Sequence, residues 1–307
     1  MTRILTHQNF SLGNTPALNG WVAVVTGGQP GIGKEITAQL LLHDIEKVII
    51  LARNEDAYIT AREEWRYRKG ISLENIIPVE FVKCDLGDIQ DVKAAVEKIK
   101  QVTDRIHILV CNAALGVPNE YRRSPQNIER VFATNCVGHQ VLATLLLPLL
   151  RNGVTPSSDW PALYDGIWRY GRSKLGKILF ANELSRRLLD DQDPASKQIY
   201  VNSFFPGNIV TEQWLGWDSY FGGFLGWLIR TAGSWFGQSL EEGAATALYL
   251  ATSPEVREQN HRGEYFIPIA TLCEPSAMSG DMELARDVWD WIDAQATETL
   301  GLDWQYQ

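Results

Sequence analysis

Cysteine is scarce in this chain, and the four cysteines are not arranged as metal ligands or as a disulfide framework. Cys84, Cys111, Cys136 and Cys273 are scattered, and no two share a C-x-x-C spacing. Three of them fall in or beside apolar runs, where buried thiols are expected. The pattern argues against metal and disulfide roles and indicates a reducing compartment, so we expect a cytoplasmic protein.

Basic residues are outnumbered, and no long uncharged apolar run is present. Lys and Arg total 28 against 37 Asp and Glu, which gives a net charge of -9. Phosphate contacts need a clustered basic surface, so we expect no nucleic-acid partner. Residues 1–19 lack the apolar core and cleavage site of a signal peptide, and no run reaches 18 uncharged apolar residues.

The composition is that of an ordinary globular protein, with 45% hydrophobic and 21% charged residues over 307 positions. We expect one α/β domain over residues 20–275, preceded by an N-terminal extension (1–19) and followed by a C-terminal helix and tail (276–307).

Apolar β-rich runs alternate with amphipathic helical stretches, as in βαβ units with a parallel sheet. Strands are expected at 21–26, 48–51, 77–82, 107–111, 198–204 and 265–269. Helices are expected at 32–43, 56–68, 89–100, 126–150, 169–189, 240–252 and 281–299. The alternation predicts a doubly wound, Rossmann-like parallel sheet.

A glycine-rich turn follows the first expected strand. It reads Thr26-Gly27-Gly28-Gln29-Pro30-Gly31-Ile32-Gly33 and leads into a helix. Glycines permit a tight turn and a close backbone approach, and the helix N-terminus offers unpaired N–H groups to a pyrophosphate. An ordinary βα turn is the structural alternative, but the position between strand and helix favours dinucleotide binding.

A tyrosine and a lysine lie four residues apart on the helix expected at 169–189. Tyr170 and Lys174 form a Y-x-x-x-K motif, whose spacing puts both side chains on one helix face. A phenol is a poor acid-base catalyst at neutral pH, and a neighbouring ammonium lowers the phenol pKa. A solvated helix face is the alternative interpretation.

These two motifs, together with Asp85-Leu86, Asn112-Ala113-Ala114, Asn135 and the P-G-x-x-x-T of residues 206–211, resemble the short-chain dehydrogenase/reductase family, in order over about residues 20 to 270. The overall pattern is most similar to the fungal retinol-dehydrogenase-like and WW-domain-oxidoreductase-like members. The resemblance implies that Tyr170 is the acid-base group and that Lys174 also binds the nicotinamide ribose. The cofactor contacts that it implies are Gly27, Gly31, Ile32, Gly33, Asp85, Asn112, Tyr170, Lys174, Pro206 and Thr211. It further implies that Asn135 holds a relay water, and that the protein is a homo-oligomer, as is usual in the family.

The end of the second expected strand bears on the choice of cofactor. An acid there would bind the ribose 2′-hydroxyl of NAD, whereas a cation would accept the 2′-phosphate of NADP. The strand runs into Ala52-Arg53-Asn54, and Arg53 can pair bidentately with a phosphate. We therefore predict NADP in preference to NAD.

The family's catalytic serine should stand at the end of a fifth strand. Ser157 lies thirteen residues before Tyr170, a fitting distance, but residues 151–156 preceding it contain no β-branched apolar run. The sequence leaves open a shortened or irregular strand that still presents Ser157 or Ser158, a deletion of the strand, and a coding-sequence error.

An aromatic-rich segment at 212–238 occupies the place of the family's substrate lid. Its many aromatic side chains alternate with glycines, which suits a bulky apolar ketone or alcohol. Packing within the domain and a peripheral membrane contact are the alternatives, although Arg230 is the one cation there.

We therefore expect an NADP(H)-dependent oxidoreductase that acts on a small hydrophobic carbonyl or secondary alcohol, in fungal secondary metabolism. A cofactor-binding pseudoenzyme that lacks a competent catalytic serine is the alternative, and a chain that cannot close its sheet is a third.

Overall fold

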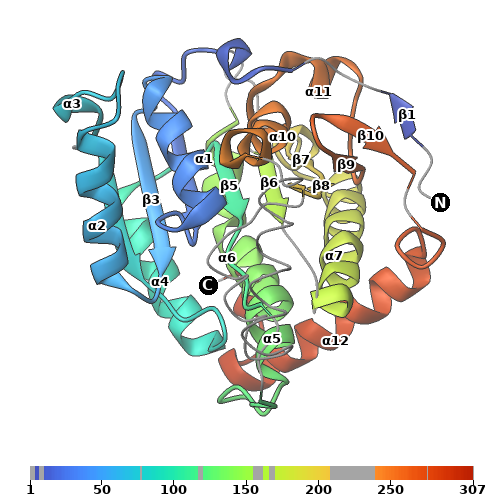
Figure 1. Ribbon diagram of the computed structural model, residues 1–307. Helices are drawn as coiled ribbons and strands as arrows, with labels where there is room; N and C mark the ends of the chain where they lie inside the picture. The colour runs from blue at the N-terminus through green and yellow to red at the C-terminus, as the bar shows by residue number, and fades with distance from the viewer. Residues whose placement is uncertain are drawn as a thin grey trace, which may run out of the picture.

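A six-stranded parallel sheet forms the centre of the protein (Figure 1). The computed structural model describes residues 4–6, 10–76, 78–116, 120–154, 162–165, 170–207, 239–274 and 276–306. The strands lie in the order β4-β3-β2-β5-β6-β7. They are β2 (Val22–Thr26), β3 (Lys47–Ala52), β4 (Val79–Lys83), β5 (Ile108–Cys111), β6 (Ala162–Asp165) and β7 (Tyr200–Val201). The order reverses between β2 and β5, which confirms the predicted doubly wound fold.

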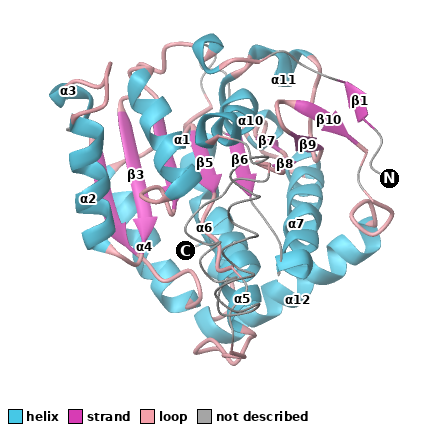
Figure 2. Cartoon of the chain, viewed as in Figure 1, coloured by secondary structure: helices cyan, strands magenta, loops and turns pink. Residues whose placement is uncertain are grey.

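Helices cover both faces of this sheet (Figure 2). On one face lie α1 (Gly31–Leu42), α2 (Glu55–Arg66) and α10 (Leu240–Thr252), which share one hydrophobic core with the sheet. On the other lie α4 (Ile89–Val102), α6 (Gly138–Asn152), α7 (Tyr170–Asp190) and α12 (Met282–Leu300), which share a second core. Burial on both faces explains why β2, β3 and β5 consist almost wholly of Val, Ile, Leu and Ala.

Short helical elements connect these layers. They are η1 (Leu12–Asn14), α3 (Leu73–Ile76), α5 (Arg130–Phe132), the π-helical turn η2 (Ala133–Val137), η3 (Ser196–Gln198), α11 (Pro254–Glu258) and η5 (Trp304–Tyr306). The helix expected at 126–150 therefore begins at Arg130 and contains a π turn. Among the described residues, the segment Arg130–Asn152 is long and apolar enough to cross a membrane, but 83% of its apolar window is buried in the fold, as in a core helix.

The fifth strand in the parallel order is present but short. It is β6, whose Ala162 to Asp165 pair in parallel register with Ile108 to Cys111 of β5. The expectation that the strand precedes Ser157 is wrong, because β6 begins after that residue. A deletion that leaves the sheet open is excluded by the pairing of β6 with both β5 and β7. Ser157 itself lies outside the described residues.

The strand expected at 198–204 is divided in two. After β7, the chain passes Asn202 and forms β8 (Ser203–Phe204), which belongs to a second sheet of order β1-β10-β9-β8. The amide of Asn202 explains the break, because its Nδ2 donates to His261 O (2.9 Å) while its Oδ1 accepts from Glu264 N (3.0 Å). Its side chain thus binds the segment that leads into β9.

The second sheet joins a strand near the N-terminus to the strands that precede the C-terminal helix. β8 pairs in parallel with β9 (Tyr265–Ile267), and β9 pairs antiparallel with β10 (Thr271–Cys273). β1 (Ile4–Thr6), a strand that the sequence analysis did not predict, pairs antiparallel with β10.

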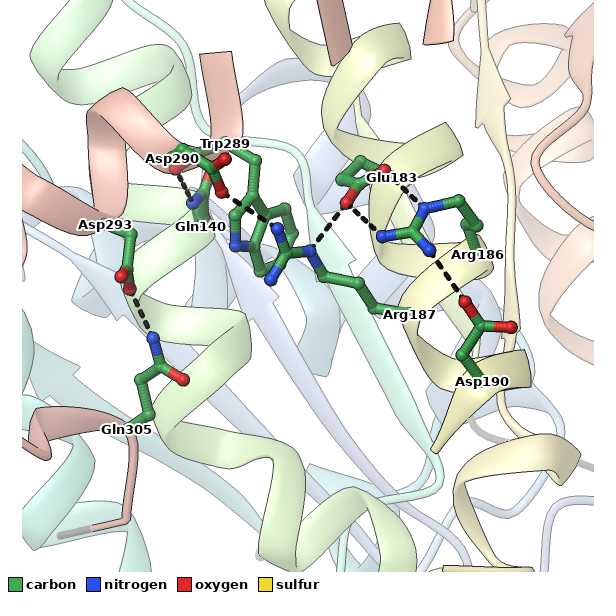
Figure 3. Close-up of polar contacts among 9 residues, drawn as sticks. All are labelled: Gln140, Glu183, Arg186, Arg187, Asp190, Trp289, Asp290, Asp293 and Gln305. Carbon is green, nitrogen blue, oxygen red and sulfur yellow. Dashed lines mark hydrogen bonds and ion pairs between the residues drawn. The ribbon is translucent and has the colours of Figure 1, made fainter. Parts of the chain in front are cut away.

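An ionic cluster joins α7 to α12, as Figure 3 shows. The fully buried carboxylate of Glu183 accepts hydrogen bonds from Arg186 and Arg187, at 2.7 to 2.8 Å. Arg187 also donates to Asp290 (2.9 Å), and its guanidinium lies 4.8 Å from the ring centroid of Trp289 on α12. The catalytic helix of the predicted site is thereby attached to the C-terminal helix.

We expect Glu183→Gln to lower the free energy of unfolding by about 1–2 kcal/mol at neutral pH, because the amide carries no charge and its NH₂ group cannot accept the hydrogen bond that Glu183 Oε2 accepts from Arg186 Nε. Burial alone would raise the pKa of Glu183, but the hydrogen bonds from Arg186 and Arg187 outweigh it and hold the pKa below its ordinary value of 4.5. The carboxylate therefore contributes stability above that value, and the contribution is lost as pH falls through the lower folded pKa.

Thermal melts between pH 7 and pH 3 test this expectation, and the difference between the wild type and the Gln variant should shrink toward acid pH. Asp190→Asn is the matched control, because Asp190 pairs with Arg186 at an exposed position. Equal melting temperatures of wild type and Glu183→Gln at pH 7 would refute a stabilising role for the carboxylate.

Candidate active site

The glycine turn lies at the switch point of the sheet, where β2 and β5 end side by side. The side chain of Asn112 follows β5, and its Nδ2 donates to the carbonyl oxygens of Thr26 and Gly27, both at 3.0 Å. The backbone N–H of Ala113 donates to Thr26 Oγ1 at 2.9 Å. The two strand ends are therefore tied together at the crevice where open α/β sheets bind ligands.

The turn needs its glycines for two reasons. Gly27 and Gly31 have φ values of 60° and 51°, in the left-handed region that side chains disfavour. A Cβ atom on Gly33 would lie 2.1 Å from the carbonyl oxygen of Gly27 and 2.5 Å from Asn112 Nδ2. Ile32, between the last two glycines, packs half-buried against the core on the α1 face. The turn is therefore closely packed and rigidly positioned.

The helix that follows the turn begins without a side-chain cap. Asn54, Asp88, Ser239 and Asp281 cap α2, α4, α10 and α12, respectively. The N-cap residue of α1 is Pro30, and no side chain of the described residues accepts a hydrogen bond there. In the same turn, Gln29 is buried and its Oε1 has no hydrogen-bond partner among the described residues. The N-terminus of α1 can thus receive an anionic ligand.

Arg53 and Asp85, two of the charged residues predicted to bind the cofactor, differ in their surroundings. Arg53 directly follows β3, is exposed, and has no ion pair with any of the described residues. Asp85, two residues beyond β4, accepts from Arg130 Nη2 (2.5 Å) and from the N–H of Gly87 (2.9 Å). Burial opposes ionisation of Asp85, but these donors lower its pKa below the ordinary value. Arg130 was not identified from the sequence.

Asn135 lies in the π turn η2 and is almost fully buried. Its Oδ1 accepts from the N–H of Leu115 (2.8 Å), and its Nδ2 donates to Leu115 O (3.1 Å). The side chain thus holds the segment that follows Asn112. The relay-water role that the resemblance implies for Asn135 remains a prediction.

A buried histidine connects the π turn to the glycine turn. His139 Nδ1 lies 3.0 Å from the carbonyl oxygen of Asn135, and His139 Nε2 lies 3.0 Å from Thr26 Oγ1. Burial lowers the pKa of His139 well below its ordinary value of 6.5, so the ring is neutral at physiological pH. A neutral ring that donates from Nδ1 must accept at Nε2, and the hydroxyl of Thr26, which also donates to Val110 O (3.2 Å), lies within reach of that nitrogen. The sequence analysis missed His139, although it stands one helical turn after Asn135.

The structure describes some of the remaining predicted residues and not others. Tyr170 and Lys174 occupy the first two turns of α7, and the structure describes their backbone. Pro206 follows β8 and is buried. Thr211, Ser157 and the predicted lid at 212–238 lie outside the described residues. The structure therefore brings together the glycine turn, Asn112 and Asn135, and it places α7 beside the π turn.

Comparisons with known proteins agree with this arrangement. Residues 21–218 match the family model for short chain dehydrogenase. A short chain dehydrogenase/reductase of Colletotrichum higginsianum is 31% identical over 93% of this chain and 77% of its own. The WW domain-containing oxidoreductase of Gallus gallus is 30% identical over 92% of this chain and 70% of its own, and a short-chain dehydrogenase/reductase of Armillaria gallica is 29% identical over 94% of both.

Solved structures share the fold. L-sorbose reductase from Gluconobacter frateurii, solved with NADPH and L-sorbose, has a TM-score of 0.63 at 22% identity and covers 82% of this chain and 95% of its own. An uncharacterised protein from Mycobacterium paratuberculosis has a TM-score of 0.66 at 19% identity and covers 94% and 98%. The fold and the site are those of a dinucleotide-binding α/β oxidoreductase. The chain belongs to the short-chain dehydrogenase/reductase family.

Proposed function

We propose that this protein is an NADP(H)-dependent oxidoreductase that interconverts a hydrophobic ketone and a secondary alcohol. The observation that carries the proposal is the uncapped glycine turn at the switch point of the sheet, with the exposed Arg53 at the end of the adjacent strand β3. Several solved structures with the same fold contain NADP or NADPH, which supports a nicotinamide cofactor.

The residues around the turn fit such a cofactor. The N–H groups at the start of α1 would bind the pyrophosphate, for which Gly33 leaves space. The buried, unpartnered Oε1 of Gln29 would accept a hydrogen bond from a ribose hydroxyl. Arg53 would pair with the 2′-phosphate. Asp85 would contact the adenine, Pro206 and Thr211 would close over the nicotinamide end, and the cofactor would supply a hydride to the carbonyl carbon.

The protein's own residues would move the proton. Tyr170 would donate a proton to the carbonyl oxygen during reduction and accept it during oxidation. Lys174 would favour the phenolate and hold the nicotinamide ribose, while Asn135 would hold the water that links this group to solvent. Ser157 would polarise the carbonyl if the segment before β6 brings it to the site.

The cofactor preference is tested with Arg53→Ala. We expect the variant to bind NADPH about 10- to 100-fold more weakly and NADH about as well as the wild type, because one charge-assisted pair with the 2′-phosphate is lost. Isothermal titration and melting temperatures with each cofactor provide the measurement.

Arg62→Ala, on the exposed face of α2, removes a cation nearby and is the matched control. Equal loss of NADPH binding in both variants would show a general effect of charge. A wild-type protein whose melting temperature neither cofactor raises would refute the proposed function.

One observation favours a second candidate, a cofactor-binding protein without turnover. The short strand β6 ends at Asp165, in register with Cys111, where the family resemblance requires the catalytic serine. NADPH binding without reduction of any ketone in a panel would support this candidate. Loss of one carbonyl donor typically costs a factor on the order of 100 to 1000 in rate, so a slow but measurable turnover would support the enzyme.

The proposal extends to the location, assembly and substrate of the protein. The four cysteines are buried and form no disulfide, which supports a cytoplasmic location. The family resemblance supports a homo-oligomer and a place in fungal secondary metabolism, and the aromatic-rich composition of residues 212–238 supports a hydrophobic substrate.

A further inference from the structure

A second lysine on α7 is buried in the core beside the proposed site. Lys177 is 2% exposed and lies three residues after Lys174 and seven after Tyr170. Residues at these spacings share one helix face, so α7 presents all three positions on the same side. Buried lysines are rare, because removing an ammonium from water is costly. The mechanism above gives Lys177 no role.

The surroundings of Lys177 belong to the site. Its ammonium interacts electrostatically with the thiols of Cys111, at the end of β5, and Cys136, in the π turn, and with the imidazole of His139. The helix packs closely here, since a Cβ on Gly176 would lie 3.0 Å from Cys136 Sγ. Three elements of the site, α7, β5 and the π turn η2, therefore meet around this side chain.

The charge on Lys177 depends on this environment. Burial lowers its pKa to about 8, and the thiols of Cys136 and Cys111 act in the opposite direction. Lys177 in turn helps to lower the pKa of His139. Asp165 of β6 is the acidic residue in backbone register with Cys111. Since the pKa remains above 7, Lys177 is mostly protonated at neutral pH.

We propose that Lys177 is a positioning residue, a buried second cation on the catalytic face of α7 that stabilises the phenolate form of Tyr170. The proposal rests on the proposed function, in which Tyr170 is the acid-base group. Two helical turns separate positions 170 and 177, a distance of about 10 Å along the axis. A unit charge about 10 Å from an ionisable group in a protein interior shifts the pKa of that group by about one unit.

The phenol of Tyr170 can be titrated without turnover. The ultraviolet absorbance of phenolate is followed against pH, and the curve of Tyr170→Phe is subtracted from that of the wild type. The same pair is then measured with Lys177→Met, which keeps an unbranched side chain but removes the charge. We expect the phenol pKa of Tyr170 to rise by at least about half a unit in the Met background.

Two further variants separate charge from packing. Lys98→Met, at an exposed position of α4, should leave the phenol pKa unchanged, whereas Lys177→Arg should preserve most of the wild-type value. An unchanged phenol pKa in a folded Lys177→Met protein would overturn the proposal. Normal NADPH binding by that variant would leave the cofactor site supported, so failure of this inference is distinguishable from failure of the proposed function.

The wild type alone provides a test if the Met variant does not fold. Because Lys177 loses its proton near pH 8, its titration should couple to that of Tyr170, and the phenol curve should depart from a single-site shape in that range. A single-site curve with an ordinary tyrosine pKa near 10 would also overturn the proposal.

Discussion

Replacing Tyr170 with phenylalanine is expected to reduce the turnover number by about 10²- to 10⁴-fold. The substitution removes the proton donor and acceptor but keeps the ring, and general acid-base catalysis typically contributes a factor of that size. NADPH affinity should change much less, because the proposed cofactor contacts of the glycine turn and Arg53 remain. Steady-state rates on a panel of hydrophobic ketones, combined with a binding titration, separate the two effects.

Tyr67→Phe is the matched control, because Tyr67 is 87% exposed at the end of α2 and takes no part in the site. The control should retain wild-type rates. If Tyr170→Phe is as active as the wild type, another group carries the proton, and the assignment of the Y-x-x-x-K motif is wrong.

Gly33→Ala is expected to weaken NADPH binding by at least tenfold and to lower the free energy of unfolding by about 1–3 kcal/mol. The added methyl group would lie 2.1 Å from the carbonyl oxygen of Gly27, so the turn or the start of α1 must shift. A shift there would also disturb Asn112, whose amide binds the same carbonyl group. Chemical denaturation and a titration with NADPH measure the two consequences.

Gly13→Ala serves as the control for this substitution. A Cβ on Gly13 would meet only one side-chain oxygen, at 3.9 Å, so the variant should behave as the wild type does. A Gly33→Ala protein with unchanged NADPH affinity would contradict the assignment of this turn as the pyrophosphate site.

The parallel sheet could be predicted where strands are buried on both faces. β3, with the sequence Lys-Val-Ile-Ile-Leu-Ala, lies within one residue of the expected 48–51 at each end. Such runs are distinct because the covering helices exclude polar side chains from both faces. The glycine turn could be predicted for a similar reason, since its backbone geometry tolerates few other residues.

The fifth strand could not be located in this way. β6 has the sequence Ala-Leu-Tyr-Asp, in which no β-branched residue occurs. It forms a strand because its backbone pairs with β5 on one side and with β7 on the other. This pairing depends on residues far away in the sequence and not on the propensity of these four residues. The break in the strand expected at 198–204 could not be predicted for a related reason. The side chain of Asn202, which ends β7, forms hydrogen bonds with residues about sixty positions away.

The candidate site was predictable in its motifs but not in its connections. Arg130 pairs with Asp85 and His139 with Thr26 across 45 and 113 positions, so local sequence spacing could not show these connections. Lys177 stands at a helical spacing from Tyr170 that the sequence does show. Its burial, which makes it notable, depends on how α7 packs against β5 and the π turn.

The pairing of β1 with β10 also has a consequence for biosynthesis. β1 is made by the ribosome long before β10, with which it forms its ladder. Until residues 271–273 have left the ribosome, the backbone N–H and C=O groups of β1 have no strand to pair with. Contacts so distant in sequence form slowly, and unpaired strand edges expose a nascent chain to aggregation. The second sheet should therefore close last, after translation has passed β10, and the yield of folded protein should depend on chaperones during that interval.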